Sequence, residues 1–190
     1  MAKQKILLVT DYIALHTGFA TVARNIVKRL QHDYEWYQLA WFYRPEYRNP
    51  NVPIPEDRIY RTKNDSRDMY GALSFPKLVI DQLKGVDIVW SIGDEWMCNH
   101  IAEWNTWKNF YWILYTPIDS FPVPKHWLDT YKKADILVMY TQWAKNILME
   151  TYPELAEKTI VIPHGVDISV FRPLPIEEKI AVRKEIDPKL

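Results

Sequence analysis

The chain lacks several features that mark secreted, membrane-spanning or nucleic-acid-binding proteins. It has a single cysteine, Cys98, which excludes an internal disulfide and fits a reducing compartment. The number of lysines plus arginines equals the number of aspartates plus glutamates, at 24 each, so the chain has no excess of positive charge that would indicate binding to a nucleic acid. No apolar run is long enough to cross a bilayer, and Asp11 interrupts the first one too early for a signal peptide. We therefore expect a cytoplasmic protein without nucleic-acid partners.

Two glycine-rich phosphate motifs are also absent. Neither the GxGxxG dinucleotide fingerprint nor the GxxxxGK[ST] phosphate loop occurs in the chain. This disfavours a dinucleotide-dependent oxidoreductase. What the chain has in quantity is aromatic residues, with nine tryptophans and twelve tyrosines, which suit either large helix-sheet contacts or stacking on sugars and bases.

The first strand, loop and helix organise the rest of the chain. Residues 6–9 (ILLV) are apolar without alternation and predict a strand buried on both faces, while residues 19–30 carry an apolar stripe at helical spacing. Between them Thr17 can cap the helix, and Gly18 would let a ligand approach the backbone where the helix amino end attracts anions. The loop is either a structural turn or a phosphate site. Its length favours the second, since connections usually have about 2 to 6 residues, and its candidate residues are Asp11, His16, Thr17 and Gly18.

Strands and helices alternate along the remainder. Strands are expected at 35–43, 58–62, 86–92, 110–115, 135–140 and 159–162, and helices at 75–84, 96–107, 125–134 and 141–152. This alternation predicts an α/β, Rossmann-like, doubly wound and mainly parallel sheet covered on both faces. After residue 171 a proline-rich linker leads to a charged amphipathic helix with nothing beyond it to pack against.

Acidic residues follow two of the predicted strands. Asp94 and Glu95 come after the strand at 86–92, and Asp119 follows the strand at 110–115. Ligands of open α/β sheets gather at the carboxyl ends of strands, so these carboxylates are expected at the site, although Asp119 could also be a turn aspartate that binds its own backbone. Asp94 and Glu95 with Cys98 and His100 match no compact zinc spacing, so no metal is expected.

The last predicted strand runs into Pro163-His164-Gly165-Val166-Asp167, followed by Phe171-Arg172-Pro173. Together with the opening strand and loop, the strand at 134–138 and the helix start at 141–145, this order resembles the amino-terminal half of the group 1 (family four) glycosyltransferases. Their two-domain GT-B fold has such a turn where the first domain meets the second. From the residues alone, we expect Gly165 to supply a positive φ there, with His164 and Asp167 fixing the turn; the alternative is contact with the donor or the acceptor.

The resemblance implies retaining transfer of a sugar from a nucleotide-sugar to a carbohydrate or other hydroxyl acceptor, without a metal. Residues 1–171 would be the acceptor-side domain, and 172–190 the start of a missing nucleotide-sugar-binding domain, so the fragment alone would be inactive. The Gly18 loop would face the donor phosphates, and Asp119 would stand where many members have a histidine. The alternative is a non-catalytic half-domain that binds carbohydrate or a partner chain. The basic residues Arg24, Lys28 and Arg29 could contact a lipid surface or form a solvated helix face.

Overall fold

A computed structural model describes residues 3–47, 52–63, 65–104 and 109–187. It contains one seven-stranded sheet in the order β3-β2-β1-β4-β5-β6-β7, and each neighbouring pair is parallel. The strands are β1 (Lys5–Asp11), β2 (Glu35–Trp41), β3 (Ile59–Arg61), β4 (Ile88–Ile92), β5 (Tyr111–Thr116), β6 (Ile136–Met139) and β7 (Thr159–Val161). The α-helices are α1 (Gly18–Leu30), α2 (Ser74–Lys77), α3 (Glu95–Trp104), α4 (Leu128–Lys133), α5 (Gln142–Thr151) and α6 (Ile176–Ile186). The predicted parallel α/β sheet is confirmed.

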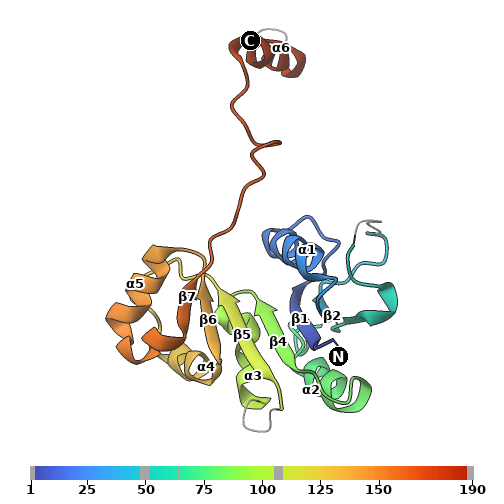
Figure 1. The fold of residues 1–190 in the computed structure, drawn as a ribbon, viewed down its shortest axis with the longest axis vertical. Coiled ribbons are helices and arrows are strands. Elements are labelled where there is room, and N and C mark those ends of the chain that lie inside the picture. Colours follow the sequence, from blue (N-terminus) through green and yellow to red (C-terminus); the bar gives the residue numbers. More distant parts are fainter. Residues whose placement is uncertain (1–2, 48–51, 64, 105–108, 188–190) are drawn as a thin grey trace.

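Strand β1 lies inside the sheet between β2 and β4, as its uninterrupted apolar sequence predicts (Figure 1). The strand order changes direction here, because the chain first adds β2 and β3 on one side of β1 and then returns to add β4 on the other. Such a switch point leaves a crevice outside the carboxyl ends of the two diverging strands, where α/β proteins bind ligands. The position of β1 therefore fixes where a site is to be sought.

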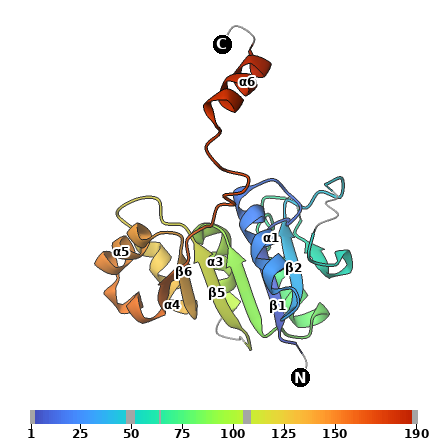
Figure 2. The same cartoon turned by 45° about the horizontal axis from the view of Figure 1, so that its top comes forward.

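Helices pack on both faces of the sheet, as expected, but they cover the two faces unequally. Among the described helices, α1 alone packs on one face, through Ala20, Ala23 and Val27, whereas α2 to α5 pack on the other (Figure 2). On the α1 face, β5 and β7 leave Tyr111 47% and Ile160 42% exposed. One thirteen-residue helix cannot span seven strands, so parts of this face over β5 and β7 stay open, although Tyr115 and Val138 on the same face are buried.

Several predicted helices are irregular in the structure. The helix predicted at 75–84 begins as α2, with Pro76 in its first turn, and continues as the π-helix η2 (Leu78–Gln82). Gly85, at φ +102°, ends it as expected. The helix predicted at 125–134 is the 3₁₀ turn η4 (Lys125–Trp127) followed by α4, and residues 105–107 of the one predicted at 96–107 lie outside the described residues.

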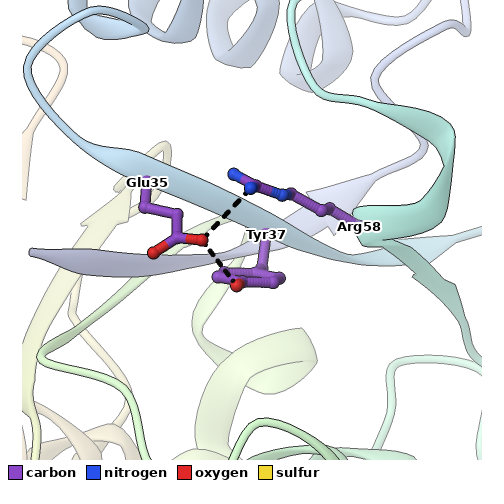
Figure 3. A network of polar contacts seen from close by, with 3 residues as sticks. All are labelled: Glu35, Tyr37 and Arg58. Atoms are coloured by element: carbon purple, nitrogen blue, oxygen red, sulfur yellow. Dashed lines mark hydrogen bonds and ion pairs between the residues drawn. The ribbon is translucent and has the colours of Figure 1, made fainter. Parts of the chain in front are cut away.

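A polar network ties the start of β2 to the short 3₁₀ turn η1 (Glu56–Arg58) at the edge of the sheet (Figure 3). The Glu35 carboxylate accepts a hydrogen bond from the Tyr37 hydroxyl (2.9 Å) and pairs with the Arg58 guanidinium (3.2 Å). The guanidinium also lies 5.4 Å from the centre of the Tyr37 ring. Three side chains thus hold the edge strand β3, which follows η1 directly, against the sheet.

Beyond β7 and the 3₁₀ turn η5 (Pro153–Lys158) that precedes it, the chain leaves the sheet. An extended segment leads to α6, which stands apart from the sheet and has no buried residue (Figure 1). The prediction that α6 is amphipathic is wrong, because Lys179 and Arg183 fall between its apolar residues around the helix. No helix of the described residues is both long enough and apolar enough to pass through a membrane.

Candidate functional site

The loop between β1 and α1 forms the first side of the candidate site. Thr17 caps α1 as predicted, since its hydroxyl oxygen accepts a hydrogen bond from the Ala20 amide (3.2 Å). The same hydroxyl donates to the Asp11 carboxylate (2.5 Å). Asp11 is 6% exposed, whereas His16, Thr17 and Gly18 are exposed. Apart from its two chain neighbours and the backbone of α1, no atom of the described residues lies within 4 Å of a Cβ placed on Gly18, so the helix start is open to a ligand.

Two residues that were not expected to belong to this loop hold it in shape. Gln38, fully buried in β2, donates from Nε2 to the Asp11 carbonyl oxygen (2.8 Å) and accepts from the Ile13 amide (3.2 Å). Arg24 of α1 donates to the carbonyl oxygens of Ile13 (2.5 Å) and Leu15 (3.1 Å). The sequence does carry a signal for Gln38, because it is a polar residue between apolar residues in the interior of a strand. Arg24 is thus a brace for the loop, and the lipid contact of Arg24, Lys28 and Arg29 stays a prediction.

The length of the loop between β1 and α1 does not favour a phosphate site, contrary to the prediction. Because β1 extends to Asp11 and α1 begins at Gly18, the connection runs only from Tyr12 to Thr17, within the ordinary range. Most of it is buried. The case for a ligand at this loop therefore depends on its open helix end and on its neighbours.

The carboxylates predicted at separate strand ends act on one another electrostatically. Burial raises the pKa of Asp94, and the charge of Asp119 raises it further, while a hydrogen bond from Trp96 lowers it. Burial raises the pKa of Asp11, partly offset by the Thr17 hydrogen bond. The pKa of Tyr70 is raised by burial and then by the charges of Asp11 and Asp94.

Because β1, β4 and β5 are neighbouring parallel strands, their carboxyl ends meet at one edge of the sheet, and these groups share that region. Gly18 begins α1 at the same edge, beside Asp11. The structure thus brings the Gly18 loop and Asp119 to one side of the molecule. Tyr70, from the loop between β3 and α2, had no signal in the sequence.

Glu95 lies elsewhere. It is 2% exposed, and its carboxylate accepts a hydrogen bond from the Thr130 hydroxyl of α4, so it sits beneath that helix instead of on the strand-end surface. Its burial raises its pKa. Cys98 and His100 are also buried, and burial lowers the pKa of His100 to about 4. Within the described residues, no three side chains of the His, Cys, Asp or Glu type gather as a metal site would require.

The turn after β7 is held by aromatic contacts. The His164 ring lies 4.2 Å from the Tyr140 ring centre and 5.6 Å from that of Tyr115. Asp167 accepts hydrogen bonds from the Ser169 amide (2.9 Å) and hydroxyl (2.6 Å). The expectation of a positive φ at Gly165 is wrong: among the described glycines only Gly71 and Gly85 have one. The side chains on either side of Gly165 fix the turn without it.

Comparisons with known proteins identify the fold. No family model matches the chain, and no curated protein matches it. Among solved structures it is similar to the apo form of the lipopolysaccharide outer core galactosyltransferase WaaB, with a TM-score of 0.60 and 18% sequence identity. The match covers 92% of this chain and 50% of that one, so the chain spans about half the length of the solved protein. The chain therefore has an α/β Rossmann-like fold like that of a GT-B glycosyltransferase domain.

Proposed function

We propose that this chain is the acceptor-side, amino-terminal domain of a retaining GT-B glycosyltransferase that uses a nucleotide-sugar donor. The observation that carries the proposal is the arrangement at the switch point of the sheet. There the open start of α1 lies at the same strand-end edge as Asp11, Asp94 and Asp119. The similarity to a solved galactosyltransferase supports the fold on which this depends.

The residues suit the charges that develop in glycosyl transfer. Breaking the bond between sugar and diphosphate builds positive charge on the ring and negative charge on the leaving group. The first turn of α1 has amide groups without intrahelical acceptors, and Gly18 leaves the space for the diphosphate to reach them. Asp119, exposed after β5, can stabilise the ring charge or orient the acceptor hydroxyl. No metal is required in this scheme, because the helix end and the second domain would neutralise the diphosphate.

The division of labour follows from this arrangement. Residues 1–171 would supply the acceptor wall of the cleft, and residues 172–190 would lead into a second domain that holds the nucleotide. Because one wall alone cannot surround the donor or exclude water, the chain by itself should not turn over. The turn held by His164 and Asp167 would set the path between the two domains. The single cysteine is in keeping with a cytoplasmic setting for such an enzyme.

The test uses the longest natural protein that contains this chain, assayed for sugar transfer with a panel of nucleotide-sugars. Asp119→Asn should lower kcat by about 10²-fold, the usual cost of one well-placed charge-stabilising group. Gly18→Val should abolish diphosphate contact while leaving the fold intact, because nothing in the chain occupies that space.

The matched control is Asp33→Asn, an exposed aspartate between α1 and β2, which should keep normal activity. Near-normal turnover of Asp119→Asn would reject its catalytic role. Sugar binding without transfer from any nucleotide-sugar would support the alternative, a non-catalytic carbohydrate-binding half-domain.

A further inference from the structure

Trp96, the second residue of α3, presents a large aromatic surface to solvent at the switch point. It is 49% exposed, although it lies only two residues after Asp94 and beside a well-packed core. Its indole N–H donates a hydrogen bond to the Asp94 carboxylate. The Tyr70 ring meets it edge to face, with ring centres 5.1 Å apart and planes at 85°. The indole is thus oriented by two contacts while much of its surface remains free.

The support behind Trp96 is itself rigid. Tyr70 packs edge to face on Trp41 (5.3 Å) and on Phe42 (5.9 Å), and its carbonyl oxygen accepts a hydrogen bond from the Trp41 indole (2.9 Å). Trp41 is fully buried. Side chains held in this way lose little further conformational freedom when a ligand binds, which favours affinity. An exposed tryptophan that is fixed in place is therefore suited to stack against one face of a ligand ring.

We propose that Trp96 is the stacking platform for a pyranose ring of a neutral sugar, with Asp94 accepting hydrogen bonds from its hydroxyls. A pyranose offers polarised C–H groups to the electron-rich face of an indole and hydroxyl donors at its rim. The Asp94 carboxylate retains acceptor sites beyond the one that Trp96 occupies.

The negative charge beside Trp96 favours an uncharged ligand over an anionic one. The Asp94 carboxylate beside the indole would repel a phosphate or carboxylate bound on Trp96, so an uncharged polyhydroxyl ligand fits better there, whereas the diphosphate of the proposed function meets the start of α1 on the other face of the sheet. In the context of the proposed function, on which this step rests, the ring on Trp96 belongs to the acceptor.

The experiment measures binding of simple sugars to the 190-residue chain by saturation-transfer NMR. The probes are methyl β-galactopyranoside, methyl α-glucopyranoside, lactose and maltose, with glucose 1-phosphate as the anionic counterpart. At least one neutral probe should bind, more tightly than glucose 1-phosphate, and Trp96→Ala should weaken it about tenfold, a change equivalent to about 1.4 kcal/mol. Asp94→Asn should weaken it less.

Trp143→Ala is the matched control, because Trp143 is also 49% exposed, at the start of α5, and should leave binding unchanged. The proposal is overturned if no neutral probe binds, if Trp96→Ala binds as well as the unmodified chain, if Trp143→Ala loses as much, or if glucose 1-phosphate binds more tightly and its binding also depends on Trp96.

A second measurement separates this proposal from the proposed function. In the longest natural protein, Trp96→Ala should raise KM for the acceptor more than it lowers kcat. Transfer that persists with an unchanged acceptor KM would overturn the platform alone. Trp96-dependent sugar binding without any transfer would instead overturn the glycosyltransferase and leave the platform standing.

Discussion

Asp68 organises the loop that carries Tyr70, and its replacement gives a test of the structure. The residue is 1% exposed, and its carboxylate accepts hydrogen bonds from the amides of Lys63 (3.1 Å), Leu73 (2.8 Å) and Ser74 (2.9 Å) and from the Ser74 hydroxyl. All the donors belong to the connection between β3 and the first residue of α2. One carboxylate therefore closes the whole loop.

The cost of replacing it can be worked from these contacts. Hydrogen bonds to a charged group contribute about 1.5–3 kcal/mol each, but the donors here are only partly buried and water can replace some of them. We expect Asp68→Asn to lower the free energy of unfolding by about 2 kcal/mol and Asp68→Ala by about 3 kcal/mol. For a chain of this size, 3 kcal/mol corresponds to roughly 6–12 °C in Tm.

The effect should depend on pH in a defined direction. Burial raises the pKa of Asp68, but the hydrogen bonds from Ser74, Lys63 and Leu73 together lower it below its ordinary value of 3.8. A carboxyl with a depressed folded-state pKa stabilises the protein above its unfolded-state pKa and loses that contribution as the pH falls through the folded-state value. The deficit of Asp68→Asn should therefore be constant from neutral pH down to about pH 5 and shrink below about pH 4.

Urea unfolding followed by circular dichroism, at several pH values, measures both quantities. The control is Asp65→Asn, an exposed aspartate of the same loop that accepts one hydrogen bond, from the Arg67 amide (2.9 Å), and should cost less than about 1 kcal/mol. The reasoning is refuted if Asp68→Asn is as stable as the unmodified chain at pH 7, or if its deficit is undiminished at pH 3.

The remaining predictions concern other parts of the sheet. Gly93→Ala would place a Cβ 2.9 Å from a buried indole ring and should cost about 1–3 kcal/mol in urea unfolding, whereas Gly165→Ala, with no neighbour within 4 Å, should change stability little; equal effects would contradict the packing. Asp11→Asn should be more stable than the unmodified chain at pH 7, because burial disfavours the charged form, and this gain should vanish below the ordinary pKa of 3.8; a gain that grows in acid would have the wrong sign. Arg58→Ala should lower stability by about 0.5–1 kcal/mol through its half-buried pair with Glu35, and less at high salt; a salt-independent loss would point to packing instead.

Much of the fold could be read from local sequence. The apolar run of β1 predicted an inner strand, and the threonines before α1 and α5 predicted the two helix starts, with Thr141 accepting a hydrogen bond from the Ala144 amide (3.0 Å). These features depend on a few neighbouring residues, since a buried strand needs apolar side chains on both faces and a helix start needs an acceptor for its free amides. The acidic residues that follow the strands were also predicted from local sequence. The end of a strand can be recognised from its own residues, before it is known which strands pair with one another.

The sequence by itself therefore determined a parallel α/β sheet, the order of its elements and the edge at which a ligand site is to be sought. Only the tertiary structure decided which strand ends adjoin, that Glu95 turns beneath α4, that parts of one face over β5 and β7 stay exposed, and that Tyr70 from a distant loop supports Trp96. The physical reason is that periodicity and capping are local, whereas these contacts join segments far apart in the chain. Their energies arise only when the strands pair and the helices pack, and no short stretch of residues carries a signal for them.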